Sequence, residues 1–169
     1  MRGKGFHIEL LADHDRAAFS CGVDALDRYF RERVTQDIRR HVANCFVALD
    51  ADQRVAGYYT FAATSIPLGE LPDSLARRLP RYPSLPAGLI GRLAVERHYQ
   101  GQGLGSLLVV DAAARALRSE PAVYALVVDA KDEEAAAFYA RLGFVAFVSQ
   151  PNRFFIPLSE IARRLSGKG

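Results

Sequence analysis

The stretch that decides the fold is residues 89–106, which read LIGRLAVERHYQGQGLGS. It begins as a short apolar run, typical of a buried strand, and it leads into apolar residues at helical spacing over residues 103–118. Between the two, Gly101, Gly103 and Gly105 stand at alternate positions, and each would cost a helix interior about 1 kcal/mol relative to alanine. The glycines therefore predict a loop between a strand and a helix. The first N–H groups of a helix have no hydrogen-bond partner within the helix, so such a loop suits the binding of a phosphate or pyrophosphate. The alternative is a tight turn that requires glycine and binds no ligand, because short motifs of this kind also occur by chance.

The rest of the chain alternates strand and helix patterns. Period-two or continuous apolar runs predict strands at residues 6–10, 45–49, 55–66, 123–128, 144–148 and 153–158. Apolar residues at helical spacing predict helices at residues 23–40 (broken at most once), 73–79, 131–142 and 159–165. Residues 67–86 contain five prolines, and a long insertion of this kind inside a domain usually serves a function. No repeat or linker interrupts the chain, so residues 1–169 are predicted to form one α/β domain.

The composition excludes several classes of protein. Half of the 169 residues are hydrophobic and 24% are charged, as in an ordinary soluble domain. No apolar run reaches membrane-spanning length, and the first residues lack the apolar segment of a secretory signal, so we expect a cytoplasmic protein without membrane association. Cys21 and Cys45 are isolated, and the four histidines have no triad or ligand spacing, so we expect no metal.

Arginine dominates the positive charge. The formal net charge is +3, and arginines gather in residues 28–40 and 77–92. The planar guanidinium group suits phosphate recognition. Acidic residues are interleaved with the first cluster, which is equally typical of a solvated helix face, and charge alone does not name a partner.

The glycine loop has three nucleotide-binding interpretations. A P-loop requires a lysine after its last glycine, and the chain has none there. A dinucleotide fingerprint directly follows a strand and requires glycine at the position of Ser106; here residues 96–100 separate strand from loop, and Asp129 would be its acidic residue. The third interpretation is Gln-x-x-Gly-x-Gly at residues 100–105, joined downstream by Phe-Tyr at 138–139 and Gly-Phe at 143–144.

These two motifs, in this order and with strands and helices between them, resemble the GNAT superfamily of acyl-CoA-dependent N-acetyltransferases. The resemblance covers residues 6–158. It implies an α/β GNAT fold, with a mixed central sheet of six to seven strands, a splayed central pair and about four flanking helices. The strand that ends at Val95 would separate from the strand at residues 123–128, and the gap would admit the cofactor.

The same resemblance implies acetyl-CoA as the cofactor. Its pyrophosphate would lie on backbone amides of the loop, and its pantetheine arm would pair with the end of the central strand as an added strand does. A backbone N–H near Leu93 or Val95 would polarise the acetyl carbonyl. Phe138 would pack beside the cofactor, and Arg141 or Lys131 would meet its phosphates. The implied cofactor-binding residues are Leu93, Ala94, Val95, Gln100, Gly101, Gln102, Gly103, Leu104, Gly105, Ser106, Phe138 and Arg141.

Tyr139 is the implied catalytic residue. Attack of an amine on a thioester expels a thiolate, and a tyrosine with a pKa of about 10 can donate a proton or a hydrogen bond to that sulfur. A tyrosine that only packs in the core is the alternative. Both substrates can react in one ternary complex, so no nucleophilic side chain is required, and Cys21 and Cys45 are expected to be small apolar fillers. Glu96 is interpreted either as a general base or as a surface carboxylate.

Within the superfamily, the chain is most similar to the tRNA-acetylating toxins (TacT-type) of bacterial toxin–antitoxin pairs. The similarity lies in residues 91–95, the glycine loop, the short first helices and residues 153–158. It implies acetylation of the α-amino group of aminoacyl-tRNA, which blocks translation, with a ribbon–helix–helix antitoxin as partner and a homodimer as assembly. The arginines that would contact the tRNA backbone are Arg39, Arg40, Arg77, Arg78 and Arg92.

Two alternatives stay open. An N-acetyltransferase that acts on a small-molecule amine, a protein N-terminus or a lysine would share the same cofactor residues. A non-catalytic acyl-CoA-binding module would keep the loop without turnover, and the intact Tyr139 argues against it.

Overall fold

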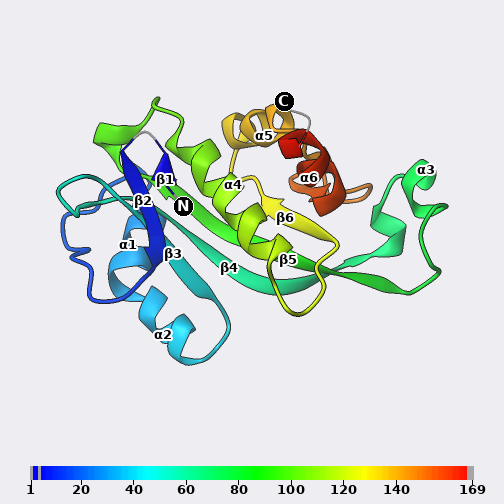
Figure 1. The fold of residues 1–169 in the computed structure, drawn as a ribbon, viewed down its shortest axis with the longest axis horizontal. Coiled ribbons are helices and arrows are strands. Elements are labelled where there is room, and N and C mark those ends of the chain that lie inside the picture. The colour runs from blue at the N-terminus through cyan, green and yellow to red at the C-terminus, as the bar shows by residue number, and fades with distance from the viewer. Residues whose placement is uncertain (1, 4, 167–169) are drawn as a thin grey trace. The chain divides into compact units, whose positions relative to one another are not determined.

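The computed structural model describes residues 2–3 and 5–166, with side chains over residues 5–164. The elements, labelled in Figure 1, are β1 (Arg2–Gly3), β2 (Phe6–Leu10), α1 (Asp24–Glu32), α2 (Val34–Arg39), β3 (Asn44–Leu49), β4 (Val55–Pro67), the 3-10 helix η1 (Leu68–Glu70), α3 (Asp73–Ala76), β5 (Ser84–Val95), the 3-10 helix η2 (Arg97–Tyr99), α4 (Leu104–Leu117), β6 (Ala125–Asp129), α5 (Glu133–Arg141), β7 (Val145–Ala146), β8 (Arg153–Pro157) and α6 (Leu158–Ser166).

The sheet is mixed, as predicted. Its strand order is β1-β2-β3-β4-β5-β6-β8-β7. The strands β5 and β6 pair in parallel, whereas β2 pairs with β3, β3 with β4, and β6 with β8 in antiparallel fashion. The described residues form eight strands, and the one without a counterpart in the sequence prediction is β1, whose two residues are too few to produce a periodic pattern.

The chain forms two compact units. The first comprises Met1–Ala62 and Gly91–Ala112, and the second comprises Ala63–Ile90 and Ala113–Gly169. The elements β4, β5 and α4 each contribute residues to both units. The glycine loop belongs to the first unit and the Phe-Tyr helix α5 to the second.

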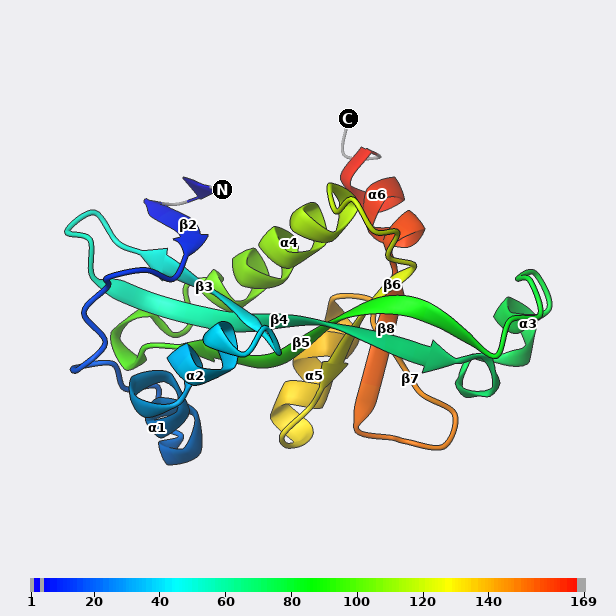
Figure 2. The same cartoon turned by 90° about the horizontal axis from the view of Figure 1, so that it is seen from below.

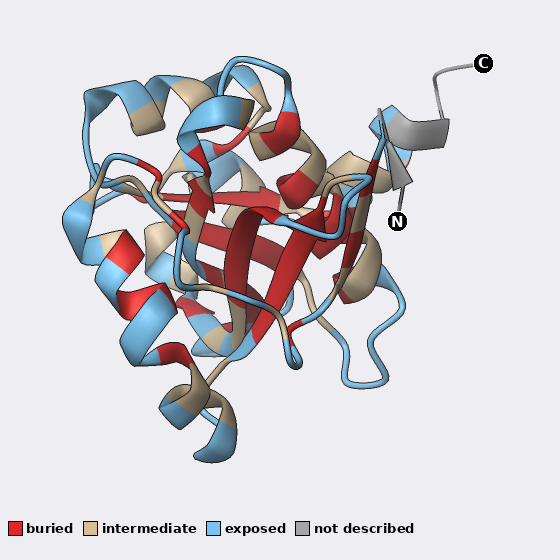
Figure 3. Cartoon of the chain, turned by 90° about the vertical axis from the view of Figure 1, so that its left-hand side faces the viewer, coloured by how far each residue is buried: buried red, intermediate tan, exposed pale blue. Residues whose placement is uncertain are grey.

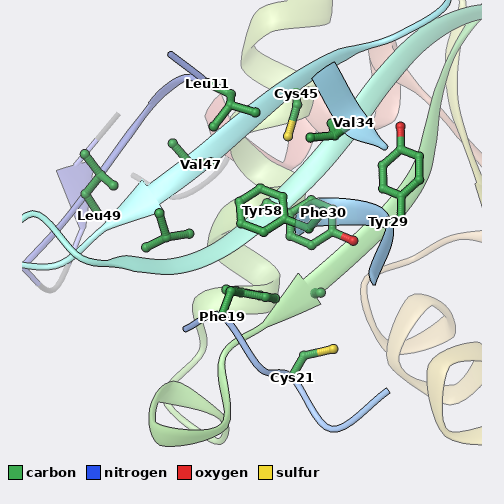
Figure 4. Close-up of a cluster of buried hydrophobic side chains, with 12 residues drawn as sticks. Leu11, Phe19, Cys21, Tyr29, Phe30, Val34, Cys45, Val47, Leu49 and Tyr58 are labelled. Atoms are coloured by element: carbon green, nitrogen blue, oxygen red, sulfur yellow. The ribbon is translucent and has the colours of Figure 1, made fainter. Parts of the chain in front are cut away.

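In the first unit, α1 and α2 pack against β3 and β4. Phe30 of α1 stacks on Tyr58 of β4 with ring centroids 4.2 Å apart, and Phe19 meets both rings edge-on (Figure 4). The helix predicted over residues 23–40 is broken once, at Arg33, whose φ of −122° and ψ of −26° are not helical. Buried aromatic stacking therefore fixes α1 on the sheet, which matters for the site because Tyr29 of α1 contacts Arg92 of β5.

In the second unit, the core strand is β6. Residues from Ala125 to Val128 are fully buried, which confirms the expectation drawn from their continuous apolar run. In the chain as a whole, Figure 3 shows that buried residues concentrate on the strands. The β5–β6 ladder ends at Ile90↔Val128, although β5 continues to Val95. The ladder therefore ends where the predicted separation of the pair would begin.

The proline-marked insertion carries η1 and α3, and Figure 2 shows α3 beyond the adjoining ends of β4 and β5. Glu70 connects this insertion to the loop after β7, because its carboxylate accepts hydrogen bonds from Ser149 N–H at 2.8 Å and from the Gln150 amide at 3.2 Å. The insertion is thus anchored to the loop between β7 and β8. Among the helices of residues 5–166, none has the length and hydropathy needed to cross a bilayer.

Candidate active site

The glycine loop connects β5 to α4, as predicted. Val95 ends β5, the short helix η2 follows, and α4 begins at Leu104. Gly101 has a φ of +81° and Gly103 a φ of +82°, a region that residues with a Cβ atom adopt only with strain. A Cβ atom on Gly101 would meet nothing within 4 Å. Backbone conformation, rather than crowding, is therefore what requires glycine at this position.

The start of α4 presents unpaired backbone donors. The first hydrogen bond of the helix runs from Leu107 N–H to the Gly103 carbonyl at 3.1 Å. The N–H groups of Leu104, Gly105 and Ser106 precede it and so have no acceptor within the helix. The first turn of α4 carries no acidic residue that would oppose an anion, and the helix dipole adds partial positive charge there. This geometry suits a phosphate or pyrophosphate.

Hydrogen bonds of Glu96 and Tyr99 stabilise the segment that precedes the glycine loop. Glu96 is only 8% exposed and caps η2, where its carboxylate accepts from His98 N–H at 2.7 Å and contacts His98 Nδ1 at 3.0 Å. The Tyr99 hydroxyl donates to Asp50 in the turn between β3 and β4. The interpretation of Glu96 as a surface carboxylate is thus wrong: it is buried and engaged with η2.

Gln100 has a role that the sequence did not reveal. Its amide nitrogen donates to the Val95 carbonyl at 2.9 Å and to the Cys21 carbonyl at 2.8 Å. Gln102 reaches back in the same way, to the His98 carbonyl at 3.3 Å. The side-chain amides of the loop therefore bind the protein itself, and the backbone is left to bind a ligand.

The end of β5 is closely packed on one side and open on the other. Ala94 is buried, and its carbonyl lies 3.0 Å from where a Cβ atom on Gly57 would stand. Gly91 and Arg92 are exposed, although β5 is an interior strand. The Arg92 guanidinium lies over the ring of Tyr29, 3.6 Å from its centroid. Leu93, Ala94 and Val95 are thus brought next to the loop within one unit, as the predicted cofactor site requires.

Tyr139 lies on α5 in the second unit and is 6% exposed. Its ring meets Phe138 edge-on at 5.2 Å and Phe144 at 5.5 Å between centroids. Burial, with a smaller contribution from the negative charge of Asp129, raises the pKa of Tyr139 to about 12. The phenol is therefore protonated at any physiological pH, which is the state that a proton donor needs.

The remaining predicted residues are exposed and distributed over both units. Arg39 and Arg40 lie at the end of α2 in the first unit, whereas Arg77 and Arg78 follow α3 in the second. Arg141 is exposed in the last turn of α5. The arginines predicted to contact tRNA are therefore accessible in both units.

The thiols are not suited to carry an acyl group. Cys21 and Cys45 are free and buried. Burial raises the pKa of Cys21 to about 11 and that of Cys45 to about 12, so neither forms a thiolate at neutral pH. Among the described side chains, no group of His, Cys, Asp and Glu has an arrangement that could hold a metal ion.

Comparison with known proteins decides the family. A sequence model described as an acetyltransferase (GNAT) domain matches residues 41–146. The chain belongs to the GNAT family of acetyltransferases. This membership confirms the resemblance inferred from the glycine loop and the Phe-Tyr motif.

Several GNAT relatives are similar over nearly the whole chain. A tRNA-acetylating toxin of Mycobacterium tuberculosis is 34% identical over 155 residues, which cover 90% of this chain and 91% of that protein. The structure of AtaT complexed with acetyl-methionyl-tRNAfMet has a TM-score of 0.85 and 29% identity, and covers 95% of this chain and 99% of that one. A tyrosine-to-phenylalanine mutant of the AtaT toxin, bound to acetyl-CoA and to the C-terminus of the antitoxin AtaR, has a TM-score of 0.79 and 27% identity, and covers 97% and 99%. Among GNAT enzymes, the chain is thus similar to tRNA-acetylating toxins, as its sequence indicated.

The residues of the loop fit the cofactor of a GNAT enzyme. A pyrophosphate needs backbone donors without side chains in the way, and Gly101, Gly103 and the first amides of α4 supply them. Which side chains meet the remaining phosphates, with Arg141 or Lys131 as candidates, stays a prediction.

Proposed function

We propose that this protein is an acetyl-CoA-dependent N-acetyltransferase that acetylates the α-amino group of aminoacyl-tRNA and thereby acts as the toxin of a toxin–antitoxin pair. The observation that carries the proposal is the similarity to a tRNA-acetylating toxin and to a probable TacT toxin along nine tenths of the chain, in a protein whose glycine loop has open backbone donors. We also propose that it acts in the cytoplasm, where aminoacyl-tRNA is found.

Backbone groups of the first unit would hold the cofactor. The amides from Gly101 to Ser106 would bind the pyrophosphate, and the backbone of Leu93, Ala94 and Val95 would pair with the pantetheine arm. A backbone N–H near Leu93 or Val95 would donate to the carbonyl oxygen as negative charge develops on it. When bound, acetyl-CoA supplies the thioester that the amine attacks.

Side chains of α5 would contact the cofactor and assist the departure of its thiol. Phe138, which is half-buried, would pack beside the cofactor. Tyr139 would donate a hydrogen bond or a proton to the departing sulfur. Its raised pKa keeps the phenol protonated and therefore able to donate. The acceptor is an α-amino group with a pKa near 7.7, so a useful fraction is neutral at cellular pH. A strong general base is then unnecessary, which agrees with the engagement of Glu96 in capping η2.

Exposed arginines would hold the acceptor. Guanidinium groups bind phosphate through paired donors, and Arg39, Arg40, Arg77, Arg78 and Arg92 are all exposed. We further propose an antitoxin as partner, since the AtaT toxin is bound by the C-terminus of its antitoxin AtaR. The proposals that this antitoxin is of the ribbon–helix–helix class and that the protein forms a homodimer rest on the sequence resemblance to TacT-type toxins.

The test is acetylation by the purified protein. Labelled acetyl-CoA is supplied with charged tRNA, with the same tRNA after deacylation, and with a mixture of polyamines and lysine peptides. We expect label only on charged tRNA, and growth arrest when the protein is expressed from an inducible promoter. Label on polyamines or peptides but not on charged tRNA would overturn the tRNA proposal in favour of another N-acetyltransferase, and acetyl-CoA binding without transfer to any amine would overturn catalysis.

A further inference from the structure

Gln100 joins two segments that are far apart in the sequence. Both hydrogen bonds of its amide nitrogen go to backbone carbonyls, one at Val95 and one at Cys21, at 2.9 and 2.8 Å. Val95 is the last residue of β5, and Cys21 belongs to the segment that leads into α1. Because a primary amide has two N–H groups, this nitrogen has no donor left for a ligand.

The connection continues from Cys21 into α1. The Cys21 N–H donates to Asp27 Oδ1 at 2.8 Å, and Asp27 lies on α1 with only 5% of its surface exposed. A parallel contact runs from Arg97 N–H to the Ser20 carbonyl at 2.9 Å. Figure 4 shows Cys21 beside the aromatic cluster that fixes α1 on the strands. The segment before α1 is therefore held by Gln100 and Arg97 on one side and by Asp27 of α1 on the other.

Contacts also link α1 to two of the arginines that we propose bind tRNA. Tyr29 of α1 lies under the guanidinium of Arg92, 3.6 Å from ring centroid to Cζ. The Tyr29 hydroxyl donates to Asp37 of α2 at 2.7 Å, and α2 ends at Arg39. A continuous set of contacts thus runs from Gln100 through Asp27 and α1 to Arg92 and Arg39.

We propose that Gln100 is a positioning residue for the acceptor as well as for the cofactor. Its amide holds the segment before α1 against the glycine loop, so α1 keeps the orientation in which Arg92 and Arg39 bind tRNA. The side chain acts through the protein and touches neither substrate. This inference rests on the proposed function, since it concerns the acceptor of that reaction.

Steady-state kinetics of Gln100→Ala test the proposal. Loss of the amide leaves the Val95 and Cys21 carbonyls without these donors, and losing a hydrogen bond of this kind corresponds to about a 3- to 10-fold change in affinity. We expect KM to rise by about that factor for acetyl-CoA and for aminoacyl-tRNA alike. The matched control is Gln36→Ala, which makes the same change at an exposed position of α2 and should alter neither KM.

Variants of Asp27 provide a second kinetic test. Asp27→Ala removes the acceptor of the Cys21 N–H and should raise KM for aminoacyl-tRNA more than KM for acetyl-CoA. Asp27→Asn keeps an oxygen acceptor in place and should restore KM toward the wild-type value. In the double variant Gln100→Ala with Asp27→Ala, the increase in KM for tRNA should be smaller than the product of the single increases, because both residues act in one chain of contacts.

The inference is overturned if Gln100→Ala raises KM for acetyl-CoA alone. It is also overturned if the increase in KM for aminoacyl-tRNA in the double variant equals the product of the two single increases. A wild-type protein that does not acetylate charged tRNA would instead overturn the proposed function. The positioning of α1 would then be judged by amide hydrogen exchange without substrate. Exchange over residues 19–32 that is faster than in the wild type for Gln100→Ala, but not for Gln36→Ala, supports the connection. Exchange that is no faster in Gln100→Ala than in Gln36→Ala refutes it.

Discussion

The substitution Tyr139→Phe separates the chemistry of the phenol from its packing. The ring contacts with Phe138 and Phe144, at 5.2 and 5.5 Å between centroids, survive the change because only the hydroxyl is removed. We therefore expect the free energy of unfolding to change by no more than about 1 kcal/mol. Loss of a positioned proton donor lowers kcat by about 100- to 10,000-fold, which is about 3 to 5 kcal/mol in the activation barrier.

The assay compares kcat at saturating acetyl-CoA and aminoacyl-tRNA, with acetyl-CoA affinity measured by calorimetry and stability by urea unfolding. Tyr82→Phe is the control, since Tyr82 is 62% exposed and should tolerate the same change. The ratio of wild-type to variant kcat should stay constant from about pH 7 to about pH 10, because the pKa of Tyr139 is raised to about 12. Full activity of Tyr139→Phe would refute the proton-donor role, and a large loss of stability with unchanged kcat would make Tyr139 a packing residue.

Three further predictions follow from crowding, charge and burial. In Gly57→Ala, the new Cβ would stand 3.0 Å from the Ala94 carbonyl oxygen, a backbone atom that can yield only if β5 shifts, so the free energy of unfolding in urea should fall by about 1 to 3 kcal/mol. Gly103→Glu places a carboxylate and a Cβ in a loop position with a φ of +82°. Calorimetry should then detect no acetyl-CoA binding while circular dichroism still shows a folded protein, and unchanged affinity would exclude pyrophosphate binding by the glycine loop. Burial raises the pKa of Cys45 to about 12, so unfolding should become easier as the pH rises from the ordinary thiol value near 8.5 toward 12, and Cys45→Ala should remove that part of the pH dependence.

The sequence predicted those features that neighbouring residues determine. Glycine in the left-handed region is a local requirement, so Gly101 and Gly103 marked the loop, and Gly143, with a φ of +102°, marked the end of α5. The acidic first turn of α5 likewise signalled its start, and Asp132 caps it by accepting the Ala135 N–H at 2.8 Å.

The sequence could not predict what depends on contacts between distant segments. Gln100 lies in a recognisable motif, yet its partner Cys21 is far along the chain, and no periodic pattern connects the two. Glu96 looked like a surface carboxylate because charged residues usually are exposed, whereas its burial follows from the way η2 folds over it. Asp27 was indistinguishable from the other acids of α1 until packing showed it buried against Cys21.

The braced loop explains how a short glycine-rich segment can hold a large cofactor. Flexible glycines lose more conformational freedom on binding than any other residue, so an unsupported loop would bind weakly. Here the side-chain amides of Gln100 and Gln102 donate hydrogen bonds to the carbonyls of Val95, Cys21 and His98, and these bonds already restrict the loop in the folded protein. Binding then requires little further ordering of the chain. Affinity for acetyl-CoA should accordingly depend on these bracing side chains in addition to the backbone amides that would contact the cofactor.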